Sequence, residues 1–206
     1  MQAITDLIMY FQKGGLVMWP LLACSITVIA IAIERFIYYK SVDSGAAFAS
    51  HYCAAVRSGD FAVATELARK GSGQCAQMLA DVEAVAGGKA EKSAFLESRA
   101  GIFMATLRDK LDYLSIIVTV SPLLGLLGTI VGMIGAFSIF NVEAGAPMAI
   151  TGGIGEALIA TATGLCVAIL SLCAHSYFAH RMDNMITDME QCFSALLEAE
   201  TRRGRS

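Results

Sequence analysis

Three long apolar segments constrain this chain more than any other feature. Each can cross a bilayer, because an α-helix rising 1.5 Å per residue needs roughly 20 apolar residues to do so. The segments run from about Leu16 to Ile33, from Tyr113 to Phe140 and from Met148 to Ala174. The chain has 206 residues, of which 56% are hydrophobic and 16% charged. This composition is typical of a membrane protein. The sequence therefore predicts an all-α, polytopic membrane protein with three transmembrane helices.

The first apolar segment could instead be the core of a secretory signal peptide. Such a peptide starts with a basic region and ends at a cleavage site of small residues. Here Asp6 precedes Lys13, and the apolar segment ends in ERFIYYK. We therefore expect a retained transmembrane helix over residues 16–37, preceded by a short interfacial helix over 1–15.

The distribution of basic residues predicts the orientation in the membrane. Of the 15 Lys and Arg residues, only Lys13 precedes the first span, and none lies between the second and third spans. The positive-inside rule then places the basic segments in the cytoplasm. The predicted order after the first span is a cytoplasmic helical region (38–112), a second span (113–140), a periplasmic loop (141–147), a third span (148–174) and a cytoplasmic tail (175–206). The N-terminus is predicted to be periplasmic.

Apolar stripes predict that the second and third spans extend into the cytoplasm as long amphipathic helices. The stripe before the second span favours an unbroken helix from about Lys92 onward. It comprises Phe95, Ile102, Phe103, Leu107, Leu111 and Leu114. The stripe after the third span comprises Met182, Ile186, Met189, Phe193 and Leu196. Upstream, Gly71-Ser72-Gly73 separates two helical patterns, which predicts a helical hairpin. We interpret all these stripes as packing surfaces.

Several classes of chemistry lack a sequence signal. The six cysteines (24, 53, 75, 166, 173 and 192) form no CxxC pair and have no histidine at metal-ligand spacing, so we expect reduced thiols and no metal or cofactor. A Walker A motif and a Ser/His/Asp or zinc signature are missing, which argues against an enzyme. A net charge of -3 without a clustered basic stretch argues against a nucleic-acid partner.

Small residues form one stripe on each of the last two spans. The second span carries Gly125, Gly128, Gly132 and Gly135, and the third carries Ala157, Thr161, Gly164 and Ala168. Membrane helices associate closely where small residues let their backbones approach. These residues therefore predict a tightly packed helix pair.

Polar residues accompany these stripes. Glu156 lies about a quarter-turn from the small stripe, Thr163 follows on the same line as Glu156, and Thr161 lies within the stripe. Thr129 is similarly offset from the glycines of the second span. A carboxylate inside a membrane usually faces a partner, a bundle interior or water. We interpret the four polar residues as the edge of a narrow hydrated path. Alternatively, each threonine bonds its own helix and Glu156 reaches interfacial water.

The segments GGLVMWPLLACSITVIAIAIERF, SPLLGLLGTIVGMIGAF and GGIGEALIATATGL resemble the three spans of the ExbB/TolQ/MotA proton-channel family, ExbB above all. The resemblance implies functional polar residues at Thr129, Glu156 and Thr161. The angular position on the line of Glu156 favours Thr163 over Thr161, and we keep Thr163 as a secondary candidate. It also implies five copies around two copies of a single-span, ExbD-like partner that carries a membrane aspartate. Proton flow would then drive a TonB-like periplasmic effector. One departure is Leu170, where relatives often have proline.

These observations predict a multi-pass inner-membrane subunit of a motor driven by the proton-motive force, with membrane lipid around it. A TolQ-like motor for envelope integrity and a non-conducting scaffold, in which Glu156 serves assembly, are the alternatives. A MotA-like flagellar stator is disfavoured, because four spans are expected there.

Overall fold

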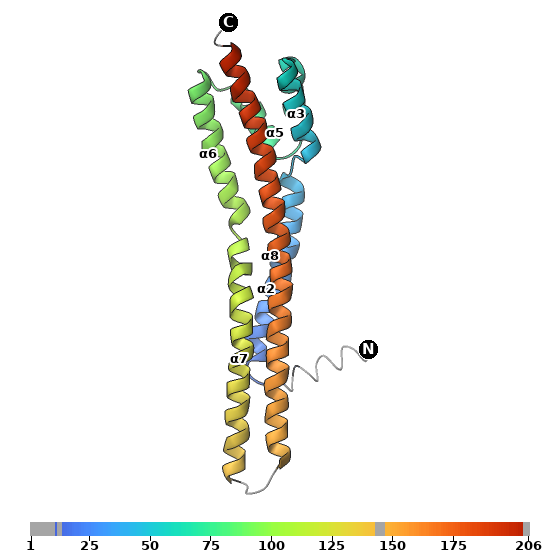
Figure 1. The fold of residues 1–206 in the computed structure, drawn as a ribbon, viewed down its shortest axis with the longest axis vertical. Coiled ribbons are helices and arrows are strands. Elements are labelled where there is room, and N and C mark those ends of the chain that lie inside the picture. Colours follow the sequence, from blue (N-terminus) through green and yellow to red (C-terminus); the bar gives the residue numbers. More distant parts are fainter. Residues whose placement is uncertain (1–10, 12–13, 143–146, 204–206) are drawn as a thin grey trace. The chain divides into compact units, whose positions relative to one another are not determined.

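The computed structural model of the chain describes residues 11, 14–142 and 147–203 (Figure 1). Regular structure in this part of the chain is helical throughout. The helices are α2 (Met18–Val42), α3 (Ala46–Ser58), α4 (Phe61–Lys70), α5 (Gln74–Glu83), α6 (Lys89–Arg108), α7 (Leu111–Val142) and α8 (Pro147–Arg203). Three helical stretches are long and apolar enough to span a membrane, which confirms the predicted fold class. Most of the expected interfacial helix and most of the expected periplasmic loop lie outside the described residues, and the described residues 14 and 15 are not helical.

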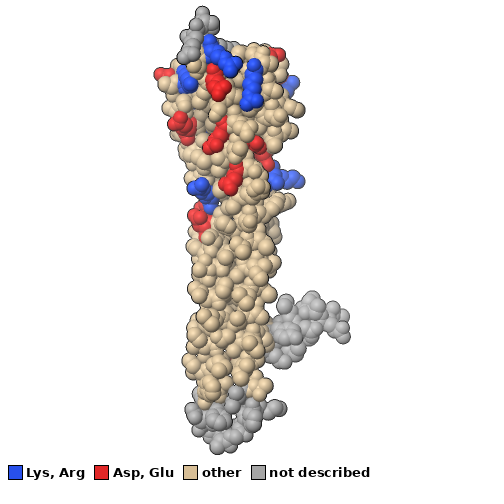
Figure 2. All heavy atoms as spheres, viewed as in Figure 1, with Lys and Arg blue, Asp and Glu red and all other residues tan. Residues whose placement is uncertain are grey.

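The chain divides into two compact units. Unit 1 comprises Met1–Ile33 and Asp112–Ser176, and unit 2 comprises Glu34–Leu111 and Tyr177–Ser206. Charged side chains gather over unit 2 (Figure 2), whereas the described part of unit 1 carries only Asp112 and Glu156. Each unit therefore has its own surface chemistry and its own mode of packing.

Unit 1 is built on α7 and the first half of α8, which lie side by side (Figure 1). The two helices run antiparallel, because Gly125 packs against Thr161 while Gly132 packs against Gly153 and Ala157. The start of α2 adds a small cluster of Val17, Met18 and Leu21. Large apolar side chains on the opposite faces stay exposed, as membrane lipid or another copy of the chain would require. Examples are Leu123, Leu126, Ile130 and Ile134 on α7 and Leu158, Leu165, Ile169 and Leu172 on α8.

Unit 2 contains the predicted helical hairpin, formed by α4 and α5. Its helix ends follow standard capping rules. The Asp60 carboxylate accepts a hydrogen bond from the Val63 N–H at the start of α4, at 3.1 Å. The Glu91 carboxylate accepts one from the Gly88 N–H at the start of α6, at 2.9 Å. The hairpin is confirmed, because α4 and α5 contact each other and only residues 71–73 separate them, and α3 precedes it as an additional helix.

The core of unit 2 consists of large side chains. Its fully buried members include Tyr39, Tyr52, Leu79, Val82, Leu96, Leu107, Met189 and Cys192. The stripe predicted on α8 is confirmed, since Met182, Met189, Phe193 and Leu196 are buried. The stripe predicted on α6 is wrong at Ile102, which is 65% exposed. Leu96 and Ala100 occupy the buried face of that helix instead.

The helix expected to run unbroken into the second span is interrupted at Asp109 and Lys110, which form a turn between α6 and α7. Arg35 explains the interruption. Its Nη1 donates to the carbonyl oxygens of Thr106 at 3.0 Å and Leu107 at 3.4 Å. The Tyr39 hydroxyl also donates to the Leu107 oxygen, at 2.8 Å. In a continuous helix these two carbonyls accept from the backbone four residues later.

Arg35 was expected only to end the first span, but it is a buried structural residue. Its side chain is 4% exposed, and its guanidinium pairs with the neighbouring Glu34 carboxylate at 2.8 Å. The same guanidinium lies over the Tyr38 ring, 4.8 Å from its centre. A charged group survives burial when it is paired and hydrogen-bonded in this way.

Candidate functional site

The seam between α7 and α8 brings the two backbones into direct contact. A Cβ atom added to Gly164 would lie 2.6 Å from the Ser121 carbonyl oxygen and 3.1 Å from the Gly125 Cα. One added to Gly132 would lie 2.9 Å from the Gly153 carbonyl oxygen. Real Cβ atoms do not approach so closely without a shift of their neighbours. Glycine at these positions therefore sets the distance between the helices.

Gly135 does not belong to this seam, contrary to the sequence interpretation. It is exposed, and a Cβ there would meet no atom within 4 Å. Ala136 takes its place, since it is 3% exposed and lies against Gly153. The contact row on α7 follows Gly128, Gly132 and Ala136 at four-residue steps, so Gly135 is rotated away from α8.

Ala160 also belongs to the seam, although it was not predicted: it is fully buried opposite Gly128. The predicted stripe on α8 stepped from Ala157 to Thr161, yet both Ala160 and Thr161 face α7. Positions three and four residues apart share one helix face, so this contact could have been found from the spacing.

Thr161 is the one predicted polar residue whose hydroxyl crosses the seam. Its Oγ1 donates to the Gly125 carbonyl oxygen at 3.0 Å and lies 3.2 Å from the carbonyl oxygen of Ala157 in its own helix. The side chain is half-buried. Thr161 therefore combines a contact between the helices with an oxygen atom that can still accept a hydrogen bond.

Among the described residues, Thr129 and Thr163 bond only to their own helices. Thr129 Oγ1 donates to the Leu126 carbonyl oxygen at 2.6 Å, and Thr163 Oγ1 donates to that of Ile159 at 2.8 Å. The antiparallel register places Thr129 near the level of Glu156, between the Gly125–Thr161 and Gly132–Gly153 contacts. For each threonine the donor is engaged by backbone, so its oxygen is left to act as an acceptor.

Glu156 lies on α8 beside the seam, half-buried. In the described parts of unit 1, Asp112 at the start of α7 is the only other carboxylate residue. No hydrogen-bond or ion-pair partner of the Glu156 carboxylate is found among residues 14–142 and 147–203. Its carboxyl group instead lies against the backbone of Gly15, where an added Cβ would collide with the carboxylate. No local pattern indicates this contact, because Gly15 and Glu156 are 141 positions apart.

The buried hydroxyl of Ser121, near the seam, was also not predicted. Ser121 is fully buried, and its Oγ has no hydrogen-bond partner in the described part of the chain. Ser171, equally buried, donates to the Leu114 carbonyl oxygen at 2.9 Å. Pro122, which follows Ser121, lies inside α7 and has no N–H to donate. Serine and proline are common in membrane helices, which is why neither drew attention.

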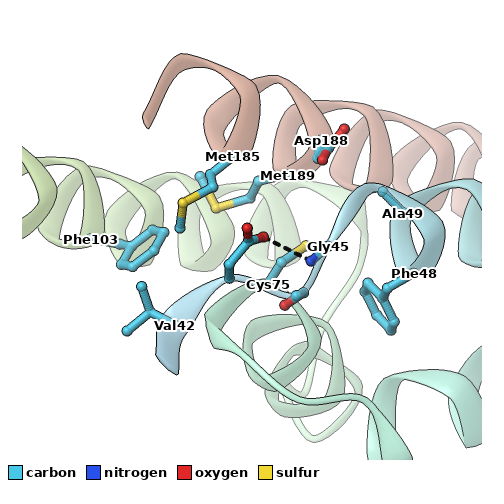
Figure 3. Close-up of a pocket in the computed structure, with 11 residues that line it drawn as sticks. Val42, Gly45, Phe48, Ala49, Cys75, Phe103, Met185, Asp188 and Met189 are labelled. Carbon is cyan, nitrogen blue, oxygen red and sulfur yellow. Dashed lines mark hydrogen bonds between the residues drawn. The ribbon is translucent and has the colours of Figure 1, made fainter. Parts of the chain in front are cut away.

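Unit 2 contains a small cavity, of about 10 Å³, beside the end of α2 (Figure 3). That volume corresponds to about one water molecule. Asp43 lies at its edge and accepts from the Gly45 N–H at 2.8 Å. Burial, together with the negative charge of Asp43, raises the pKa of the Asp188 carboxyl. The cavity is too small to hold a substrate.

Three buried thiols in unit 2 also fail to form a reactive site. The Sγ atoms of Cys53 and Cys192 are 4.0 Å apart. Burial raises the pKa of Cys53 to about 11, and a hydrogen bond with Cys75 raises the pKa of Cys192. Protonated, buried thiols are poor nucleophiles. No group of three or more His, Cys, Asp and Glu side chains suited to a metal ion occurs among the described residues.

The sequence of part of unit 2, α7 and most of α8 matches a known protein family. The model of the MotA/TolQ/ExbB proton channel family matches residues 72–191, which include all of α7, the seam between α7 and α8, and Glu156. The chain belongs to this family. It is therefore a membrane protein of a family of proton-channel motors.

Relatives named ExbB match most of the chain. The putative biopolymer transport protein ExbB-like 3 of Synechocystis sp. is 31% identical over 166 residues, which cover 78% of this chain and 79% of the relative. The biopolymer transport protein exbB1 of Vibrio cholerae is 27% identical over 186 residues, covering 87% of this chain and 82% of the relative. The Tol-Pal system protein TolQ of Pseudomonas aeruginosa is 36% identical over 81 residues, only 39% of this chain and 35% of the relative.

Proposed function

We propose that this chain is the proton-conducting subunit of an inner-membrane motor, assembled as a homo-oligomer, a pentamer by family resemblance, around an ExbD-like single-span partner. The observation that carries the proposal is the position of Glu156. A half-buried carboxylate lies beside a helix seam in an otherwise apolar unit. Such a residue is costly in a membrane and marks an ion or proton pathway by default.

The hydrogen bonds of the threonines suggest how the path handles a proton. Thr161 and Thr129 donate to backbone carbonyls, so their oxygens are acceptors. An acceptor stabilises a water molecule, a hydronium ion or a protonated carboxylic acid. We expect these threonines to hold a protonated aspartate of the partner or a water beside it, and Glu156 to adjust the charge along the path. Thr163, bonded to its own helix, has the secondary role.

This function needs no covalent chemistry, and we propose that the protein is not an enzyme. The free energy would come from protons moving down their gradient, and the effector would be a TonB-like periplasmic protein. The ExbB-like role is favoured over the TolQ-like role because relatives named ExbB match about twice as much of the chain as the TolQ relative does. The proposed orientation has a periplasmic N-terminus and a cytoplasmic C-terminus.

A paired experiment separates a proton path from a scaffold. The chain is copurified with its single-span partner, and energised outer-membrane uptake is measured in the same strains. Glu156→Ala is expected to leave the complex assembled yet abolish uptake, whereas Glu156→Asp retains part of it. If uptake fell only as far as the amount of complex falls, Glu156 would serve assembly. Full uptake by an assembled Glu156→Ala complex would contradict the proposal.

A further inference from the structure

The Gly14–Gly15 turn, just before α2, lies against α8 on the side that carries Glu156. A Cβ added to Gly15 would collide with Glu156 Oε1, and would lie 2.8 Å from its Cδ and 3.3 Å from its Cγ. The carboxyl end of the side chain therefore occupies the space that any residue other than glycine would fill at position 15.

Backbone conformation gives an independent reason for glycine at the same position. Gly15 has φ +71°, in the left-handed region that residues with a Cβ adopt only at a cost. The two requirements are separate, because one concerns the backbone of the turn and the other the side chain of a residue in a different helix.

The turn is fixed in place on both sides of Gly15. A Cβ on Gly14 would lie 2.5 Å from Met18 Cγ and 3.3 Å from Ile159 Cγ2, one turn of α8 beyond Glu156. Val17 follows and approaches Gly128, where an added Cβ would lie 3.7 Å from Val17 Cβ. Val17 is also 7% exposed. The turn is thus wedged beside the seam rather than resting on the surface.

We propose that the Gly14–Gly15 turn is a positioning element for Glu156. It covers one side of the carboxylate with backbone, fixes the side-chain conformation and leaves the other side open for exchange. Gly15 then acts through Glu156 and itself handles no proton. The inference rests on the proposed function only where it gives Glu156 a role in transport. The contact between Gly15 and Glu156 is tested without any proton flow.

The first test is a double-mutant cycle of Gly15→Ala and Glu156→Asp on the purified complex, read as the unfolding equilibrium constant. Aspartate is one methylene shorter, so its carboxylate withdraws from position 15. The backbone strain of alanine at φ +71° is the same in both backgrounds and cancels in the cycle. Gly15→Ala raises the unfolding equilibrium constant by some factor in the wild-type background. We expect that factor to be at least about threefold smaller in the Glu156→Asp background.

The second test measures the carboxylate directly. Dicyclohexylcarbodiimide modifies protonated carboxyl groups in membranes, and mass spectrometry reports the labelling rate of Glu156. Gly15→Ala should change the labelling rate of Glu156, because the added methyl displaces the carboxylate from its cover and alters its access to the reagent. Two matched controls should label as the wild type does. Gly45→Ala has a comparable backbone, φ +81°, in open space, and Gly152→Ala adds a methyl to α8 where nothing lies within 4 Å.

An additive cycle, or a labelling rate unchanged by Gly15→Ala, would overturn the inference. Proton flux through the wild-type complex is measured in parallel. A complex that conducts no protons would overturn the proposed function, while the cycle and the labelling would still decide whether Gly15 positions Glu156.

Discussion

The two units of this protein are packed by opposite means. In unit 1, glycine and alanine bring α7 and α8 into backbone contact, and large apolar side chains point outward. In unit 2, the core is filled by large side chains such as Tyr39, Tyr52 and Met189, and charges cover the surface. The difference follows from the surroundings. In lipid no hydrophobic force drives apolar side chains inward, so the helices associate through close backbone packing. In water the hydrophobic effect drives large apolar side chains into a core.

The largest loss of stability is expected from a large side chain in the seam of unit 1. Gly164→Leu would place a side chain 2.6 Å from the Ser121 carbonyl oxygen, a backbone atom that cannot rotate away. We expect a loss at or beyond the upper end of the roughly 1–3 kcal/mol typical of overpacking, measured by unfolding in mixed detergent micelles. Gly135→Leu on α7 is the matched control and should change stability little, because its Cβ meets nothing within 4 Å. Equal losses in both variants would refute the assignment of the seam.

A smaller effect is expected where unit 2 buries a charge. Arg35→Met removes the donors to the Thr106 and Leu107 carbonyls, and we expect about 2 kcal/mol of destabilisation. Tyr39→Phe removes one neutral hydrogen bond to Leu107 and should cost about 1 kcal/mol. Amide hydrogen exchange near the α6–α7 turn should accelerate in both variants.

Arg108→Met serves as the control for Arg35→Met, because Arg108 is exposed in the last turn of the same helix that Arg35 caps. Surface substitutions of this kind usually stay within about 0.5 kcal/mol. If Arg108→Met destabilised the protein as much as Arg35→Met, the cap would not be the reason for the loss.

The smallest effect concerns Asp188. Its pKa is raised in the folded protein by burial and by Asp43. For an acid whose folded pKa exceeds the unfolded one, stability is lost as the pH rises from the unfolded value through the folded value. Asp188→Asn should therefore be slightly more stable than the wild type at neutral pH and equal to it below about pH 4. Asp183→Asn removes the same charge at an exposed position on the same helix and should change the free energy of unfolding by less than about 0.5 kcal/mol at neutral pH.

The sequence predicted most where a pattern has a single physical meaning. Long apolar segments gave the three spans, and small-residue spacing gave Gly125, Gly128, Gly132 and Gly164 in the seam. It failed at Gly135, because spacings of three and four are nearly equivalent on a helix and only the crossing of the two helices selects Ala136. The angular argument favoured Thr163 over Thr161, because helix angles alone do not show that the hydroxyl of Thr161 reaches across to a partner helix.

Contacts between segments that are distant in the chain could not be predicted from the sequence. Arg35 caps a helix about 70 residues away, and a charged residue after an apolar span ordinarily indicates only the end of that span. Gly15 lies against Glu156 through the fold alone. Neither Arg35 nor Gly15 belongs to a recognisable local motif. The structural role of each depends on a partner residue in another helix.

The central claim is that Glu156 lies on a proton path, and proton flux tests it most directly. The copurified complex is reconstituted in vesicles containing a pH-sensitive dye, and a potassium diffusion potential drives proton entry. The account predicts a potential-dependent flux for the wild type and a loss of at least about tenfold for Glu156→Gln, which removes the charge at nearly constant size. Gly152→Ala, on the same helix, should conduct as the wild type does. A Glu156→Gln complex that conducts at the wild-type rate would contradict the account.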